Sequence, residues 1–268
     1  MRQIQTQTVF VVVILALAAL TGGCAGQSGQ TQGGLAAAEQ PQTGARNSAK
    51  IHTELAGEYY ARGQMGVAIE ELAEALRSDP NYAAAYNVLG LVYMDLREDV
   101  LAQQNFERAL KIEPNNSDTH NNYGWFLCQR KRGQTDLAVQ HFMAALKNPL
   151  YTTPEKSYTN AALCSQSNGD FKSAEEFFRK ALLLKPSYSQ ALLGLTEIYF
   201  KSGDFVAARA NISRYMQVST PTAESLWLGI RIERKVGDRN VEASYTLQLR
   251  KRFPDSKEAL ALRDGKFD

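Results

Sequence analysis

The sequence predicts an all-α protein in which about six helix-turn-helix repeats stack into a right-handed superhelix. The first observation is a period of 34 residues, which separates Gly169, Gly203 and Gly237, each followed by an aspartate. Pro80 and Pro114 have the same spacing. The second observation is that apolar residues recur within each period at i, i+3, i+4 and i+7, as in amphipathic helices. One helical hairpin cannot bury its apolar face alone, so the units are expected to stack.

The period also identifies the repeat and places its units. A length of 34 residues is that of the tetratricopeptide repeat. The clearest unit, 83–116, has aromatic, leucine and small residues at fixed places and a proline after its second helix: Tyr86, Leu89, Gly90, Tyr93, Ala102, Phe106, Ala109 and Pro114. The six units are expected near 49–82, 83–116, 117–150, 155–188, 189–222 and 223–256. The last unit is degraded, as is common for a terminal capping repeat.

The segment before the repeats begins with a predicted signal peptide, residues 1–23. Arg2 supplies a positive charge, and Val9 to Leu20 is an unbroken run of twelve apolar residues. Such a run fits the apolar part of a signal peptide. It is too short to cross a bilayer core of about 30 Å as a helix.

Cys24 follows the small residues Thr21, Gly22 and Gly23, and this junction resembles the lipobox of bacterial lipoproteins. In that motif a leucine usually stands where Thr21 is. The resemblance implies acyl chains on Cys24, and several chains anchor a protein stably because each buried methylene contributes about 0.8 kcal/mol. Ala25 after the cysteine implies sorting to the periplasmic face of the outer membrane. The alternative is an ordinary secretory signal with an incidental free cysteine.

Residues 24–48 are expected to form a flexible, lipidated tether. The segment is rich in glycine, glutamine, serine and alanine and has few large apolar residues. Such a composition cannot bury enough apolar surface to become ordered. The tether would hold the repeat domain, 49–268, away from the membrane.

Two further cysteines, Cys128 and Cys164, either form a disulfide or remain separate buried thiols. An oxidising compartment permits the bond. The repeat phase places both late in the first helices of adjacent units, and those helices are expected to lie side by side. A disulfide needs Cα atoms within about 7 Å of each other. The sequence therefore favours the disulfide.

Composition and motifs argue against several functions. The chain has 30 basic and 28 acidic residues and a net charge of +2, so nothing indicates nucleic acid as a partner. The three histidines lack metal-ligand spacing, and neither a phosphate-binding loop nor a nucleophile elbow occurs. We expect no enzyme activity, no metal, no cofactor and no small-molecule substrate. Recognition of another protein is the function that remains.

The first helices of such repeats line a concave groove at their second, fifth, ninth and twelfth positions. These positions give the candidate protein-binding residues: Asn87, Leu91, Met94, Asn121, Trp125, Thr159, Leu163, Phe200 and Trp227. They predict an apolar groove in which asparagine side chains could pair with a peptide backbone. The alternative for each apolar residue is packing between repeats, and the convex face could also bind.

The stretch HNNYGWFLCQRKRG, residues 120–133, is more specific than the repeats. With the lipobox before it and Cys164 after it, the chain resembles the type IV pilus biogenesis and stability lipoproteins, the PilF/PilW pilotin family. The resemblance extends from the signal peptide through the six repeats, with a shifted lipobox and a longer turn at 131–136 as departures.

The resemblance implies a function. Such pilotins escort secretin subunits to the outer membrane and promote their multimerisation there. The hypothesis is that the acyl anchor supplies the location and that the groove binds the secretin through the first three units. The alternatives are a general periplasmic scaffold for another envelope assembly and, less favoured, a protein that binds the pilin.

Overall fold

The structure, a computed structural model, describes residues 36–131 and 133–267, with side chains from Thr43 onward. The predicted signal peptide, Cys24 and the tether up to residue 35 lie outside the described residues. The repeats belong to one compact unit, Gln42–Asp268, and that unit is described here by itself. No helix in the described part of the chain is long and apolar enough to cross a membrane.

The described residues fold into thirteen helices and no strand, which confirms the predicted all-α class. The helices are α1 (Ala36–Ala61), α2 (Met65–Ser78), α3 (Ala83–Asp95), α4 (Asp99–Ile112), α5 (Ser117–Arg130), α6 (Thr135–Ala145), α7 (Pro154–Ser167), α8 (Phe171–Leu184), α9 (Ser189–Ser202), α10 (Phe205–Val218), α11 (Ala223–Val236), α12 (Arg239–Arg252) and α13 (Lys257–Arg263).

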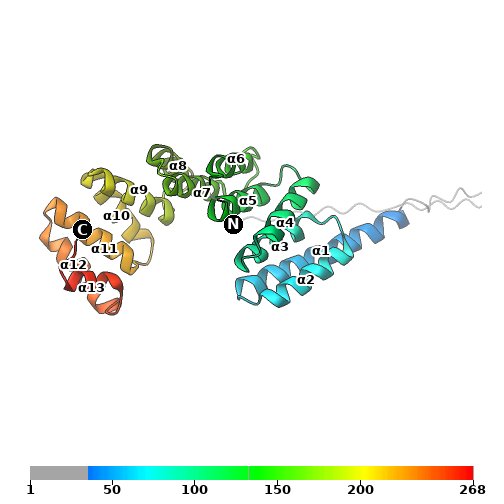
Figure 1. Ribbon diagram of the computed structural model, residues 1–268, viewed down its shortest axis with the longest axis horizontal. Coiled ribbons are helices and arrows are strands. Elements are labelled where there is room, and N and C mark those ends of the chain that lie inside the picture. The colour runs from blue at the N-terminus through cyan, green and yellow to red at the C-terminus, as the bar shows by residue number, and fades with distance from the viewer. Residues whose placement is uncertain (1–35, 132, 268) are drawn as a thin grey trace, which may run out of the picture. The chain divides into compact units, whose positions relative to one another are not determined.

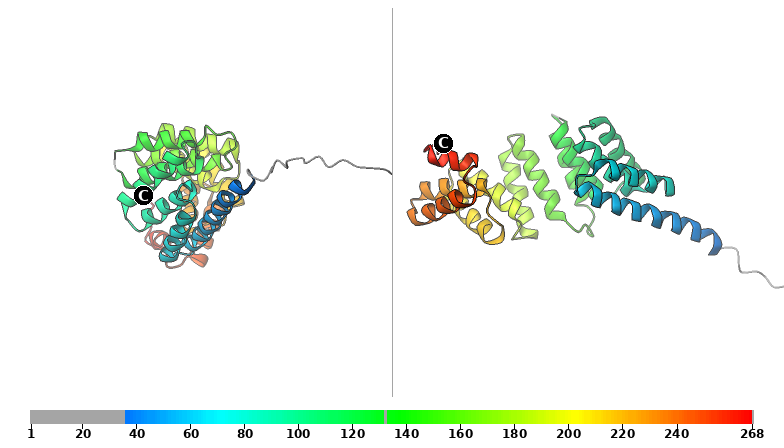
Figure 2. Two further views of the ribbon diagram at one scale, coloured as in Figure 1. Left: turned by 90° about the vertical axis from the view of Figure 1, so that its right-hand side faces the viewer. Right: turned by 90° about the horizontal axis from the view of Figure 1, so that it is seen from below.

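Consecutive helices form six antiparallel pairs, α1–α2 to α11–α12, and the pairs stack in chain order (Figures 1 and 2). The first helices α3, α5, α7, α9 and α11 each contact the next first helix along the stack, through α13 at its end. This is the tetratricopeptide superhelix that the period predicts. Helix α13 was not predicted, and it covers α11 and α12 at the end of the array.

The repeated Gly-Asp pairs explain where the helices turn. Gly203 ends α9 with a φ of 82° and Gly237 ends α11 with a φ of 93°, a left-handed conformation that favours glycine. The aspartate after each glycine then begins the next helix. Asp204 accepts a hydrogen bond from the backbone N–H of Ala207 at 2.9 Å, as an N-cap residue does. The pair therefore stops one helix and starts the next within two residues.

Small residues allow the paired helices to approach each other. Gly90 of α3 faces the fully buried ring of Phe106 of α4, and a Cβ at Gly90 would lie 2.6 Å from that ring. Buried phenylalanines fill the same place in other pairs: Phe142 of α6 and Phe178 of α8 are fully buried. Alanines complete these layers, so the core is a row of small clusters along the stack.

Helix α1 differs from the expected tether because it begins at Ala36, so the stretch from there to Ser48 is helical. Contacts with residues later in the chain explain why the end of this stretch, where side chains are described, is helical. The Ser48 hydroxyl bonds the Ser78 hydroxyl at 3.0 Å, and Arg46 lies 3.6 Å from the Glu113 carboxylate. Polar composition alone does not reveal such pairing with residues far along the chain.

Candidate protein-binding surface

The nine predicted groove residues fall into two groups. Six are half-buried, so part of each side chain is accessible to a partner: Asn87, Leu91, Trp125, Leu163, Phe200 and Trp227. The other three, Met94, Asn121 and Thr159, are buried, with exposed fractions of 6%, 2% and 0%. We call the surface that the six accessible residues share on α3, α5, α7, α9 and α11 the first-helix face.

Asn121 is not available to a peptide backbone, which corrects the expectation for this residue. Its side-chain oxygen accepts hydrogen bonds from the Ser157 hydroxyl and the Asn160 amide, both at 3.0 Å. Both donors belong to α7, so the neighbouring first helix covers the fifth position of α5. Because a buried polar group that loses its partner is costly, this contact is structural. Thr159 and Met94 are also buried, so they are not available to a partner either.

The asparagines form a chain of amides across three units. Asn122 donates to the Asn87 oxygen at 3.1 Å, and Asn121 donates to the Asn122 oxygen at 3.4 Å. Together with Asn160, these residues connect α3, α5 and α7. Asn122 and Asn160 were not predicted, because both lie outside the expected groove positions.

Cys128 and Cys164 are joined by a disulfide, with their Cα atoms 5.8 Å apart. The bond connects α5 to α7 near the ends of these helices, whereas Asn121 connects them near their beginnings. Arg130 adds a third link, because its guanidinium donates to the Met94 carbonyl of α3 at 3.1 Å. Arg130 therefore has a structural role. These links hold the middle of the first-helix face in place.

Leu91 and Trp125 lie on this fixed part of the face. Both pack against a buried cluster that contains Phe106, Phe126 and Leu127, and both remain half-buried. Apolar side chains that are anchored on one side and accessible on the other are typical of binding hot spots. They are the strongest contact candidates in the second and third units.

A pocket of about 350 Å³ occupies the first-helix face between α9 and α11. Two predicted residues, Phe200 and Trp227, line it, together with Leu193, Glu197, Lys201, Glu224, Leu228, Arg231 and Glu258. The guanidinium of Arg231 lies 4.5 Å from the centre of the Phe200 ring. The charged lining residues were not predicted, because only apolar, threonine and asparagine side chains at the groove positions were expected to bind.

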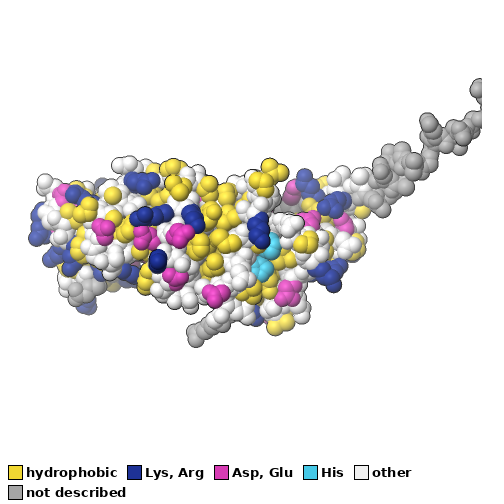
Figure 3. Space-filling view, turned by 90° about the horizontal axis from the view of Figure 1, so that it is seen from above, with side chains coloured by type: hydrophobic (Ala, Val, Ile, Leu, Met, Phe, Trp, Pro, Cys, Tyr) yellow, Lys and Arg dark blue, Asp and Glu magenta, His cyan; other side chains and the backbone are white. Residues whose placement is uncertain are grey.

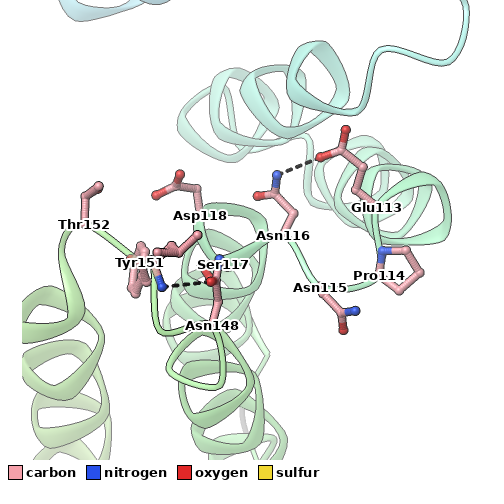
Figure 4. A pocket seen from close by; sticks show the side chains of 10 residues that line it. Glu113, Pro114, Asn115, Asn116, Ser117, Asp118, Asn148, Tyr151 and Thr152 are labelled. Atoms are coloured by element: carbon pink, nitrogen blue, oxygen red, sulfur yellow. Dashed lines mark hydrogen bonds between the residues drawn. The ribbon is translucent and has the colours of Figure 1, made fainter.

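A second pocket, of about 510 Å³, lies at the α4–α5 turn and the α6–α7 connection (Figure 4). Its polar side chains serve the turn itself. Asn116 donates to Glu113 at 2.9 Å, and its oxygen caps α5 by accepting from the Thr119 N–H at 2.9 Å. The lining includes the carboxylates of Glu113 and Asp118 and no basic residue, so it does not suit an anion.

Known proteins share this repeat architecture. Tetratricopeptide-repeat family profiles match residues 57–96, 83–116, 105–140 and 166–217. The type IV pilus assembly protein PilF of Pseudomonas aeruginosa is 32% identical over 200 residues, which are 75% of this chain and 79% of that protein. The chain belongs to this family of type IV pilus tetratricopeptide-repeat proteins.

Solved structures of the PilF/PilW family agree with the fold. The crystal structure of PilW, described as a widely conserved type IV pilus biogenesis factor, matches with a TM-score of 0.72 and 31% identity, over 80% of this chain and 97% of that one. The structure of Pseudomonas aeruginosa PilF matches with a TM-score of 0.75 and 30% identity, over 83% of this chain and all of that one. Members of this repeat family are protein-interaction scaffolds, which suits the surface described above.

A histidine pair marks another face of this PilF/PilW relative. The Nδ1 atoms of His120 and His141 are 2.9 Å apart, and histidine side chains lie beside apolar ones in Figure 3. Burial, with a smaller contribution from neighbouring His120, lowers the pKa of His141 from its usual 6.5 to about 4. No group of three or more metal-ligating side chains occurs among the described residues.

Proposed function

We propose that this protein is an outer-membrane lipoprotein that acts as a pilotin in type IV pilus biogenesis. It binds the pilus secretin subunit through the part of the first-helix face that lies in the first three units, and it promotes the outer-membrane localisation and multimerisation of that subunit. The observation that carries the proposal is the match to PilF, a type IV pilus assembly protein, over 79% of its length. The family thereby supports a role in pilus assembly, and the residues below suggest how the role is performed.

The membrane anchor is the first part of the mechanism. The sequence around Cys24 supports acylation of its thiol, and several acyl chains bind a membrane far more stably than one. A subunit bound to the repeats would be carried wherever the lipid is sorted. The anchor thus supplies the location and needs no contact with the secretin.

Binding of the secretin is the second part of the mechanism. Leu91 and Trp125 present half-buried apolar surface on α3 and α5. The Cys128–Cys164 disulfide and the asparagine chain fix the surrounding helices. A rigid site loses little conformational entropy when it binds, so a modest apolar contact can suffice. The bound secretin segment would place apolar side chains against Leu91 and Trp125.

Replacement of Cys24 by alanine tests the anchor. Envelopes are fractionated, and both this protein and heat-resistant secretin multimers are followed in each membrane. We expect the variant to leave the outer membrane and the multimers to disappear or move to the inner membrane. Unchanged multimers alongside a released protein would contradict carriage and favour a general periplasmic scaffold.

A double variant, Leu91→Ala with Trp125→Ala, tests the proposed secretin-binding contact. We expect it to remain anchored and folded while secretin multimers decrease and co-purification of the secretin is lost. Val206→Ala on α10 is the matched control, because Val206 is 77% exposed on a second helix. Multimers at the wild-type level in the double variant would show that the secretin binds elsewhere. Co-purification of pilin instead would favour the pilin-binding alternative.

A further inference from the structure

The chain folds back on itself after α13. Gly265 has a φ of 69°, and the Lys266 N–H donates to the Ala261 carbonyl at 2.9 Å, so the helix ends in a tight left-handed turn. The turn directs Phe267 toward α11, where its carbonyl oxygen meets Arg231. Phe267 therefore contacts a helix that precedes it by about one repeat.

Three residues of α11 hold Phe267. The Trp227 ring stacks on the Phe267 ring with centroids 5.3 Å apart, and the Arg234 guanidinium lies 3.8 Å from the centre of the same ring. The Nε of Arg231 donates to the Phe267 carbonyl oxygen at 3.0 Å. The phenyl ring thus lies between an aromatic and a cationic partner, and the backbone next to it is hydrogen-bonded.

The three α11 residues that hold Phe267 occupy groove positions of their repeat. Trp227, Arg231 and Arg234 are the fifth, ninth and twelfth residues of unit 223–256, which are positions expected to face the groove. They lie at i, i+4 and i+7, so they share one face of the helix. Phe267 is bound as a residue of a foreign peptide would be, by side-chain stacking and a main-chain hydrogen bond together.

The site extends beyond Phe267. The pocket of about 350 Å³ shares Trp227 and Arg231 with it and continues toward Leu193 and Phe200 of α9. Phe267 does not line this pocket. Space for further peptide residues is therefore present next to the stacked ring.

The charges around the pocket indicate which groups would meet a peptide. Its carboxylates already have partners: Glu197 accepts from Gln166 at 3.1 Å, and Lys257 lies 3.6 Å from both Glu224 and Glu258. Neither Lys201 nor Arg231 forms an ion pair within the described ranges. Arg231 donates to the Phe267 carbonyl oxygen in the free protein, and after displacement of Phe267 both Arg231 and Lys201 can donate to main-chain carbonyls of a bound segment.

We propose that this region is a second docking site, which takes an extended peptide segment of a partner protein that carries an aromatic side chain. In the free protein, Gly265–Phe267 occupies the aromatic end of the site as an intramolecular competitor. The proposal is independent of the secretin and of the surface at Leu91 and Trp125. A tethered segment acts at an effective concentration in the millimolar range, so a partner must displace it to bind. The apparent affinity of the partner is its intrinsic affinity multiplied by the fraction of molecules in which the site is free.

A peptide that copies residues 261–267, ALRDGKF, is the probe. It is amidated, labelled with fluorescein and titrated by anisotropy against the full chain in detergent. Phe267→Ala is expected to bind it about tenfold more tightly than the unaltered chain, because the internal competitor is removed. Trp227→Ala in the Phe267→Ala background should abolish this gain, and Val206→Ala in the same background should preserve it. Equal binding by Phe267→Ala and the unaltered chain, or by the variants with and without Trp227, would overturn the proposal.

Gly265→Val provides a second route, because a β-branched residue at a φ of 69° strains the turn while Phe267 is retained. It is expected to increase peptide binding in the same direction. Trp227 fluorescence gives an independent readout, since the chain has 2 tryptophans and Trp125→Phe leaves Trp227 alone. Phe267→Ala should shift its emission to longer wavelength, and the peptide should reverse the shift. If both variants only lower the unfolding temperature and neither binds the peptide better, the segment is a structural cap and the proposal is wrong.

Discussion

Single residues in this protein have roles that depend on which helix covers them. Asn121 and Trp125 are one helical turn apart on α5 and were both expected to face a partner. Asn121 instead bonds two donors from α7, whereas Trp125 stays half-buried at the surface. The difference arises from the neighbouring helix α7, since both residues occupy positions of the repeat that were expected to face the groove.

The His120–His141 pair leads to a prediction on pH. The folded protein holds His141 with a pKa of about 4, against 6.5 when it is exposed. Between these values the unfolded chain binds more protons than the folded one, so the free energy of unfolding decreases as pH falls from about 6.5 toward 4. His141→Gln should weaken this dependence because glutamine does not titrate. Urea unfolding at pH 7, 5.5 and 4.5 measures it, and parallel curves for both proteins would contradict the shift.

At the scale of the helices, the sequence predicts the stack well because the turns and close contacts depend on local residue types. The Gly203–Asp204 pair ends and begins helices through backbone geometry that only a few residues permit. Gly90 indicates a close approach because no side chain fits there. Helix α13 and the earlier start of α1 were not predicted, since contacts with distant residues stabilise both. The same limit applies to the site, where burial of Asn121 and the return of Phe267 depend on neighbouring repeats.

Gly90→Ala tests the close approach of α3 and α4. The added Cβ would lie 2.6 Å from the buried Phe106 ring, so the helices must separate or the ring must move. We expect the free energy of unfolding to decrease by about 1–3 kcal/mol, as in overpacked cores. Chemical denaturation measures the change.

Gly57→Ala on α1 is the matched control, because a Cβ there meets nothing within 4 Å. It should be neutral or stabilising by up to about 1 kcal/mol, since alanine favours the helix. An equal loss of stability in both variants would refute the packing explanation.

At the scale of the whole array, each repeat contacts only its neighbours, so links between units decide how the stack behaves as one body. The Cys128–Cys164 disulfide is such a link, closing a loop with a sequence separation of 36. It lies between the accessible residues of the second and third units and those of the last ones. Membership in the PilF/PilW family follows from similarity over 75% of the chain in sequence and 83% in structure, and not from any single residue.

Replacement of the disulfide by two serines tests its contribution. Without the bond, the unfolded chain is no longer restricted by a closed loop of this length and gains conformational entropy. The free energy of unfolding should therefore decrease by about 2–4 kcal/mol. Denaturation of the oxidised wild type and of Cys128→Ser/Cys164→Ser gives the difference. A wild-type protein treated with a reductant should match the variant, and stability unaffected by either change would show that the bond adds nothing to the fold.

The asparagine chain from Asn87 through Asn122 and Asn121 to Asn160 has a consequence for how the protein assembles. A solenoid can begin folding at any unit and grow outward. Here α3, α5 and α7 must all be present before these amides satisfy one another. The second, third and fourth units should therefore form one cooperative nucleus, from which order spreads toward both ends. Opening of the array would start at its outer repeats and stop at this block, so the segment holding Phe267 could detach while the units that carry Leu91 and Trp125 stay closed.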